Sequence, residues 1–385
     1  MSQGTNAANG AVLYELTHVP AFLNEDQEFW WKATAPSLDR LLNNCEYSEE
    51  SRLDHLRWYH EYIISALGPR PVAGKKPLFE PCPVYDGSAV EHSINWKEVN
   101  TARTVRFTIE AVGYEAGTDL DPYNQEASVK LLKKMAAEIP EISLERFDIF
   151  TDQLFLPKES AKTLVAQVPS GTPLSQIWIA FDLLRGKVMP KVYFMPVMKW
   201  IKTGISTTDL VFDAARKCNG KHGSFDSPIA LLDDYLRSFP PERMPVVEMV
   251  AIDCVDSPGA RIKCYLRTGV NTLAKAKFQY TLGGRLFGEA IEEGLKALES
   301  LWPILFQLEG ENDIEDREVF TAGNYCGCAI EMKSTLAVPE TKLHIPVRKI
   351  QGTDGQLCKS LSAWFEQRGH REFAAAYKKD LAATL

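Results

Sequence analysis

The sequence predicts an α+β fold in which an antiparallel β-barrel is surrounded by helices. Along the 385 residues, a helical stretch followed by two strand-like runs recurs four times, and one more helical stretch follows. Cation-x-aromatic motifs recur on the second strands, with Tyr193, Tyr265 and the equivalent His344 spaced 72 and 79 residues apart. A period of roughly 70 to 85 residues is too long for a common solenoid and indicates duplicated ααββ units. Antiparallel strand pairs with helices outside and polar side chains inside are typical of a barrel that holds a ligand.

The first half of the chain begins with two predicted helices. Apolar residues at mixed three- and four-residue spacings predict helices at 24–44 and 49–67, and Gly68-Pro69 ends the second one. Alternating apolar and polar residues predict a strand at 104–110. The other elements expected before residue 200 are a strand at 90–96, a helix at 125–139 and strands at 177–183 and 191–196.

The same signals continue through the second half. Gly186 between two basic residues is typical of a hairpin tip. Proline residues flank a helix at 229–239. The other elements expected are strands at 246–254 and 261–266, a helix at 289–301, strands at 325–332 and 342–347, and a helix at 356–381.

Composition indicates an ordinary globular protein. Hydrophobic residues make up 45% of the chain and charged residues 24%, the usual proportions of a globular domain. A net charge of −8 argues against a nucleic-acid-binding protein. No apolar run approaches the roughly 20 residues that cross a bilayer, and the N-terminus has no basic and apolar leader. We therefore expect a cytoplasmic protein with no membrane or nucleic-acid partner.

The eight cysteines are too sparse for a disulfide scaffold in a chain of this length. Cys326 and Cys328 form the only close pair, and their spacing places both thiols on one face of a strand. No histidine lies near them in the sequence, so a structural role is favoured over a zinc site.

Cations recur at equivalent positions of the second strands. On any one strand they would most simply form a solvated outer face, but their recurrence favours side chains that point into the barrel. Buried cations without partners are costly, so such a cluster needs an anion. A diphosphate, with about three negative charges, fits guanidinium and ammonium groups. The cations that share this pattern are Arg106, Lys191, Arg261, Lys263 and Lys342.

Aromatic residues alternate with these cations. Tyr193 and Tyr265 follow Lys191 and Lys263 by two residues and therefore face the same side. Aromatic rings stabilise a carbocation by cation–π attraction and keep water away from it. Cations that bind a diphosphate also stabilise the charge of that leaving group. The pattern therefore predicts a site where an allylic diphosphate ionises.

Seven short motifs, none decisive alone, occur in one order along the chain: FWWKATAPSLDRLL, VEHSIN, TVRFTIEAVG, DPYN, PKVYF, AIDCVDSPGARIKCYL and YTLGGR. In this order and at these separations they resemble the fungal dimethylallyltryptophan-synthase-type (DMATS) aromatic prenyltransferases. The resemblance runs from about Phe22 to Leu381, nearly the whole chain. It implies the fold of that family, the αββα prenyltransferase (PT) barrel.

The resemblance also implies roles for individual residues. Tyr193 and Tyr265 would shield the prenyl cation. Glu91, in VEHSIN, matches the carboxylate that hydrogen-bonds the indole N–H of the acceptor, although by itself it would pass for a surface carboxylate. The family lacks the metal-binding DDxxD motif, and here Asp233-Asp234 is not followed by the third aspartate. We therefore expect no metal and no cofactor, with no need for Mg²⁺. The prenyl diphosphate would be bound by Arg106, Lys191, Arg261 and Lys263.

Two of the expected strands depart from the family pattern. Trp178 stands where tryptophan-using members have a lysine thought to take the ring proton. We expect Trp178 in the acceptor pocket. Because an indole cannot act as a base, this residue implies another acceptor or another route for the ring proton. The strand expected at 342–347 has Lys342 and His344 where relatives have glutamine and tyrosine. His344 titrates near neutrality and is therefore a candidate proton acceptor or phosphate partner, or equally a satisfied residue of the interior.

A third departure concerns the end of the sequence. Relatives continue through a final strand pair with another shielding tyrosine, whereas this sequence ends at Leu385. A barrel without its closing pair leaves two strand edges exposed. We expect either a homodimer that seals the gap or a reorganised barrel in which the strand at 342–347 approaches the segment at 10–16. Poorer shielding of the cation would release more prenyl alcohol.

We expect residues 1–20 to be a lead-in and residues 21–385 to form a single PT-barrel domain. The expected reaction transfers a prenyl group from an allylic diphosphate, in the first place dimethylallyl diphosphate, to an indole or another electron-rich aromatic acceptor in secondary metabolism, such as indole alkaloid biosynthesis. Two alternatives stay open. Trp178, as an extra aromatic wall, motivates a terpene cyclase on the same fold, and the incomplete barrel motivates a non-catalytic relative that binds prenyl diphosphate. Glu91 favours the transferase.

Overall fold

The structure, a computed structural model, describes residues 21–84, 88–95, 102–308, 310, 312–320, 325–350 and 352–384. These residues fall into two compact units. The first unit contains the described residues up to 135 together with 178–189 and 379–384. The second contains 136–177 and the described residues of 190–378. Each unit has antiparallel strands and buried apolar side chains of its own.

Helices and paired strands alternate along the chain as predicted, and the strands follow chain order in the sheet. The strands are β1 (Val90–Asn95), β2 (Thr104–Ile109), β3 (Ile177–Leu184), β4 (Lys187–Phe194), β5 (Val246–Asp253), β6 (Arg261–Val270), β7 (Cys326–Lys333) and β8 (Glu340–His344). The α-helices are α2 (Glu25–Asn44), α3 (Glu49–Trp58), α4 (Glu126–Glu138), α5 (Glu145–Leu154), α6 (Lys158–Leu164), α7 (Val197–Thr203), α8 (Thr207–Lys217), α9 (Asp226–Arg237), α10 (Leu273–Tyr280), α11 (Glu289–Phe306), α12 (Asp354–Gln367) and α13 (Arg371–Thr384). Shorter helical turns are η1 (Tyr59–Ile63), η2 (Ile64–Ala66), η3 (Val165–Gln167), η4 (Pro241–Arg243) and η5 (Val347–Lys349).

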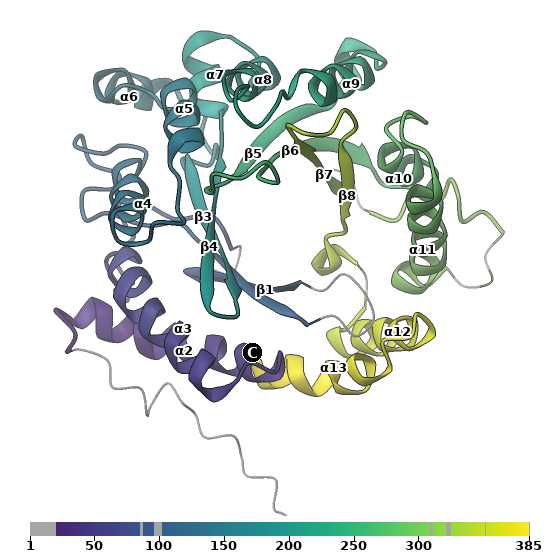
Figure 1. Cartoon of the computed structure of the whole chain (residues 1–385), viewed down its shortest axis with the longest axis horizontal. Helices are drawn as coiled ribbons and strands as arrows, with labels where there is room; N and C mark the ends of the chain where they lie inside the picture. Colours follow the sequence, from purple (N-terminus) through teal and green to yellow (C-terminus); the bar gives the residue numbers. More distant parts are fainter. Residues whose placement is uncertain are drawn as a thin grey trace, which may run out of the picture. The chain divides into compact units, whose positions relative to one another are not determined.

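In the first unit, β2 lies between β1 and β3 and is antiparallel to both. Figure 1 shows α2 and α3 beside these strands. Every second residue of β2 is fully buried, as its alternation predicts. Phe107 packs against Tyr59 and Phe181, with ring centroids 5.3 and 5.1 Å apart. The opposite face of β2 carries the half-buried Arg106 and Thr108, so polar groups stay available on that side.

In the second unit the antiparallel order is β4-β5-β6-β7-β8, and Figure 1 shows helices α7 to α11 along the outside of these strands. One face of the sheet is apolar. Val192 and Ile262 are fully buried, and Phe194 packs against Phe147 and Phe150 of α5 with ring centroids 5.9 and 5.7 Å apart. Because side chains alternate along a strand, the neighbours of these apolar residues point to the other face.

The helix expected at 49–67 is broken into three pieces. α3 gives way to the π-helical turn η1 and then to the 3-10 turn η2. Gly68 ends this stretch, as predicted, with a φ of +72°, which glycine adopts without strain. A Cβ at Gly68 would stand 2.6 Å from the carbonyl oxygen of Val112, so the close approach of the two segments also requires glycine.

Other element boundaries shift where glycine and proline intervene. The helix expected at 356–381 is two helices, because Gly369, at a φ of +88°, ends α12. β8 ends at His344, three residues earlier than expected, because Pro346 lacks the N–H needed to continue a strand. Gly186, at a φ of +86°, forms the predicted hairpin tip. Trp96, the last residue of one expected strand, and the segment at 10–16 lie outside the described residues.

Five helices were not predicted from the sequence. They are only 7 to 11 residues long, too short for helical periodicity to stand out. They are α5, α6, α7, α8 and α10.

Candidate active site

The sheet of the second unit carries charged side chains on the face opposite its apolar one. In the register of the strands, Lys191 lies opposite Asp253 and Lys263 lies opposite Glu331. Lys191 is only 4% exposed and Lys263 only 9%, so these charges are taken almost entirely out of water. Four predicted residues lie on this face, on alternate strands, and we call them the cation cluster: Lys191, Arg261, Lys263 and Lys342.

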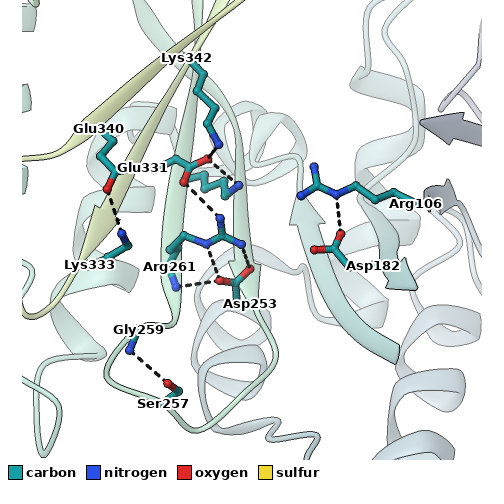
Figure 2. A network of polar contacts seen from close by, with 11 residues as sticks. Arg106, Asp182, Asp253, Ser257, Gly259, Arg261, Glu331, Lys333, Glu340 and Lys342 are labelled. Atoms are coloured by element: carbon teal, nitrogen blue, oxygen red, sulfur yellow. Dashed lines mark hydrogen bonds and ion pairs between the residues drawn. The ribbon is translucent and has the colours of Figure 1, made fainter. Parts of the chain in front are cut away.

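Two carboxylates on the intervening strands pair with these cations. Asp253 on β5 accepts hydrogen bonds from Nε and Nη2 of Arg261 at 2.8 and 3.2 Å. Oε1 of Glu331 on β7 lies 2.8 Å from Nζ of Lys263 and 2.5 Å from Nζ of Lys342. Its Oε2 accepts from Nη1 of Arg261 at 3.3 Å, and Figure 2 shows Glu331 between Arg261 and Lys342. The expectation that these cations lack partners of their own is therefore wrong.

These ion pairs set the charge of the cluster. Burial alone would raise the pKa of Glu331, but the pairs with Lys263 and Lys342 outweigh it and lower the pKa to about 2. Burial lowers the pKa of Lys263, as does Arg261, while Glu331 raises it. Four cations face the two carboxylates, Asp253 and Glu331, so a net two positive charges are left for an anion.

An aromatic row lies beside the cation cluster, two residues further along the strands. The rings of Tyr193 and Tyr265 have centroids 5.7 Å apart, and His344 meets Tyr265 edge-on at 5.6 Å. Alanine lies opposite each tyrosine on one neighbouring strand, Ala251 opposite Tyr193 and Ala329 opposite Tyr265, while Met249 lies opposite Tyr265 on the other. The two alanines therefore add little bulk beside the aromatic rings on this face.

His344 lies in a positively charged environment at the end of the aromatic row. Partial burial lowers the pKa of the imidazole, the charges of Lys263 and Lys342 lower it further, and Glu331 opposes this. The neutral form is therefore favoured at neutral pH. Because a neutral imidazole has one nitrogen that accepts a proton, His344 is chemically able to act as a base here.

The first unit holds the other predicted site residues. Nε of Arg106 lies 2.9 Å from Oδ1 of Asp182, its register partner on β3 (Figure 2). Glu91 on β1 lies opposite Thr108, which forms a hydrogen bond with the Glu91 carboxylate. Burial raises the pKa of Glu91, and this hydrogen bond only partly offsets the shift. Arg106 therefore repeats the cation–carboxylate pairing of the second unit, whereas Glu91 has a neutral partner.

Trp178 lies four residues before Asp182 on β3 and therefore on the same face of that strand. Its indole N–H is buried and has no hydrogen-bond partner in the structure. An unpaired buried donor costs free energy, so this group suits a ligand that accepts a hydrogen bond.

Sequence reasoning missed the carboxylates of Asp182, Asp253 and Glu331. Each lies on the first strand of a repeat and opposite a cation of the preceding strand. They are spaced 71 and 78 residues apart, almost the same intervals as Tyr193, Tyr265 and His344. This shared period, in strands that are otherwise apolar, was the signal that could have identified them.

The remaining polar candidates lie away from this cluster. Asp233 and Asp234 pair with Arg237 and Arg285 at 2.8 and 2.7 Å on the solvent side of α9, as predicted for a helix surface. Within the described ranges, no three histidine, cysteine or acidic residues are grouped to hold a metal ion. The same ranges contain no helix long and apolar enough to span a membrane.

The cysteines are free thiols. The predicted pair on β7, Cys326 and Cys328, is buried. Burial raises the pKa of each thiol to about 12, so both remain protonated and unreactive at neutral pH, in keeping with the structural role favoured from the sequence.

Comparison with known proteins places these features in context. The family model described as tryptophan dimethylallyltransferase matches residues 26–380. Prenyltransferase iacE of Pestalotiopsis fici is 38% identical over 94% of this chain and 84% of its own. The 7-dimethylallyltryptophan synthase hasE of Aspergillus fumigatus is 32% identical over 92% of this chain and 77% of its own.

Solved structures agree with these similarities. The crystal structure of AnaPT from Neosartorya fischeri matches with a TM-score of 0.82 and 28% identity, covering 97% of this chain and 88% of its own. This likeness confirms the predicted α+β PT-barrel fold.

The environment of His344 leads to a testable titration. We predict that NMR titration of its ring protons, assigned with the His344→Gln variant, gives a pKa below the ordinary value of about 6.5. In Lys342→Met the pKa should rise, because one repelling charge is removed. An ordinary pKa in the wild-type protein, or one unmoved by Lys342→Met, would contradict this description of the site.

Proposed function

The chain belongs to the tryptophan dimethylallyltransferase family, and from that premise we propose how its residues handle the two substrates. It is an aromatic prenyltransferase, which transfers a prenyl group from an allylic diphosphate to an aromatic acceptor. One relative above 30% identity is named a 7-dimethylallyltryptophan synthase. We extend dimethylallyl diphosphate and an indole-type acceptor to this chain on that basis.

The cation cluster is our proposed diphosphate site. Its net positive charge, almost wholly desolvated at Lys191 and Lys263, is the single observation that supports this assignment best. When the C–O bond of the allylic diphosphate breaks, the electron pair leaves with the diphosphate, and fixed cations stabilise the charge that develops there. Arg106 stays a proposed diphosphate ligand, because its pairing with Asp182 repeats the pairing pattern of Arg261.

The aromatic row is our proposed shield for the allylic cation. Tyr193 and Tyr265 follow the cations Lys191 and Lys263 by two residues on the same strand face. A cation formed at the diphosphate therefore lies next to π faces, which attract it and exclude water. We propose that the prenyl chain lies over Ala251 and Ala329, the small register partners of these tyrosines.

Glu91 and His344 are our proposed catalytic groups on the acceptor side. The carboxylate of Glu91 accepts a hydrogen bond from the indole N–H, which increases electron density on the ring that attacks the allylic cation. The ring carbon then carries a proton that must leave to restore aromaticity. We propose that neutral His344 accepts it, and that Trp178, which cannot act as a base, contributes a wall and a hydrogen-bond donor to the acceptor pocket.

We propose that the reaction needs no Mg²⁺, because the cation cluster supplies the positive charge on the diphosphate. The single PT-barrel domain over residues 21–385, the homodimer and the cytoplasmic location remain predictions. The cyclase and non-catalytic alternatives have no counterpart among the named relatives, which are transferases.

Removing a cluster cation should weaken substrate binding. We predict that Lys191→Ala and Lys263→Ala each raise the KM for dimethylallyl diphosphate by about 10- to 100-fold, since a charged hydrogen bond contributes about 1.5–3 kcal/mol. Steady-state kinetics with an indole acceptor measures this. Lys333→Ala is the matched control, because Lys333 lies on the same sheet but pairs with the exposed Glu340 at 2.9 Å. Normal turnover with an unchanged KM in either cluster variant would disprove the anion-site assignment.

Glu91→Gln keeps the shape of the side chain and removes its charge. We predict that prenylation falls by about 10²- to 10⁴-fold, the scale of losing a general acid–base group, while pyrophosphate binding stays as in the wild type. Because burial raises the pKa of Glu91, wild-type activity should decline on acidification at a higher pH than for an ordinary glutamate. Prenylation at the wild-type rate would mean that another residue orients the acceptor.

A further inference from the structure

Glu331 occupies an unusual position for a carboxylate in an anion site. It is only 2% exposed and contacts three of the four residues of the cation cluster. Its place is fixed by the sheet, because it lies directly opposite Lys263 in the β6–β7 register. The pKa of about 2 keeps it ionised over the whole neutral range. A bound diphosphate would therefore always share its cations with this negative charge.

Such a carboxylate weakens the attraction of the cluster for any anion. If the site were built only for tight binding, the four cations without a counter-charge would bind a diphosphate more strongly. The product poses the greater difficulty, because inorganic pyrophosphate carries at least as much negative charge as the substrate and binds to the same cations. Tight binding of the leaving group would then delay the next turnover, and product release limits the rate of many enzymes.

We propose that Glu331 is a resident counter-anion that lowers the affinity of the cation cluster for the diphosphate group and so lets pyrophosphate leave after each turnover. This inference rests on the proposed function, in which the cluster binds the diphosphate. Glu331 acts through the cations and through repulsion of the anion, and it does not touch the reacting carbon.

The geometry allows Glu331 and a diphosphate to bind the cluster together. Each ammonium group has three N–H donors, and Lys263 and Lys342 each direct one contact to the same oxygen of Glu331. Their remaining donors stay available to phosphate oxygens. The diphosphate therefore does not need to displace Glu331, and repulsion between the two anions persists throughout the bound state.

A purely orienting role for Glu331 predicts the opposite effect. If Glu331 served only to hold Lys263 and Lys342 in position, its removal would leave two mobile ammonium groups and weaker anion binding. The two roles can therefore be separated by the direction of a single change in affinity.

The decisive experiment measures binding of inorganic pyrophosphate to Glu331→Gln by isothermal titration calorimetry. We expect binding about tenfold tighter or more, since one unit charge near the site is removed at low effective dielectric constant. The KM for dimethylallyl diphosphate should fall with it, and kcat should also fall because pyrophosphate leaves more slowly. Glu340→Gln is the control, because Glu340 lies opposite Glu331 but pairs with Lys333 near the surface, and it should behave as the wild type.

Binding of pyrophosphate that is no tighter in Glu331→Gln, or tighter binding with an unchanged kcat, overturns this inference. Lys263→Ala separates that result from a failure of the proposed function. If the single variant Lys263→Ala binds pyrophosphate more weakly than the wild-type protein does, the cluster is the anion site and only the proposed role of Glu331 is wrong. If it has no effect, the site assignment itself is wrong.

A second variant covers a folding defect in Glu331→Gln. Glu331→Asp keeps the charge but withdraws the carboxylate by one methylene group from the two ammonium groups. Pyrophosphate should then bind about two- to threefold tighter, whereas weaker or unchanged binding overturns the proposal.

Discussion

Four cations on one face of a sheet repel one another, and the ion pairs with Asp253 and Glu331 are the interaction that allows them to stay there. Lys191 and Lys263 are almost fully buried, so without nearby carboxylates their charges would favour deprotonation or unfolding of the strands. The carboxylates lie on the intervening strands, opposite the cations they serve. The cation cluster is therefore held together by the protein alone, with its charges already compensated in part.

The alternation of side chains along the strands places a tyrosine beside two of the cations in this cluster. On β4 and β6 a cation is followed two residues later by a tyrosine on the same face, while the residue between them packs into the hydrophobic core. In the function we propose, neighbouring positions of the same strands would thus bind the diphosphate leaving group and shield the allylic cation. A one-residue slip would exchange the charged and apolar faces, so the buried Val192 and Ile262 hold the polar residues in place.

The sequence was sufficient to predict the repeats, the strand pairs and the cations, because these depend on local alternation and on a period that can be counted. It did not reveal that Glu331 lies between Lys263 and Lys342, because that contact depends on the register of three strands, of which β6 is distant in sequence from β7 and β8. Asp253 was overlooked for the same reason. The short helices α5 to α8 were not predicted because they are too short for helical periodicity to stand out. They are stabilised by packing instead, as where Phe147 and Phe150 contact Phe194.

The most direct test of the central claim is a crystal structure of the protein with a dimethylallyl thiolodiphosphate analogue that cannot ionise readily. We expect diphosphate oxygens within hydrogen-bond distance of Lys191 and Lys263, the prenyl chain against Tyr193 and Tyr265, and Glu331 still paired with its cations. A diphosphate bound away from the cation cluster, or one that has displaced Glu331 from Lys263, would contradict it.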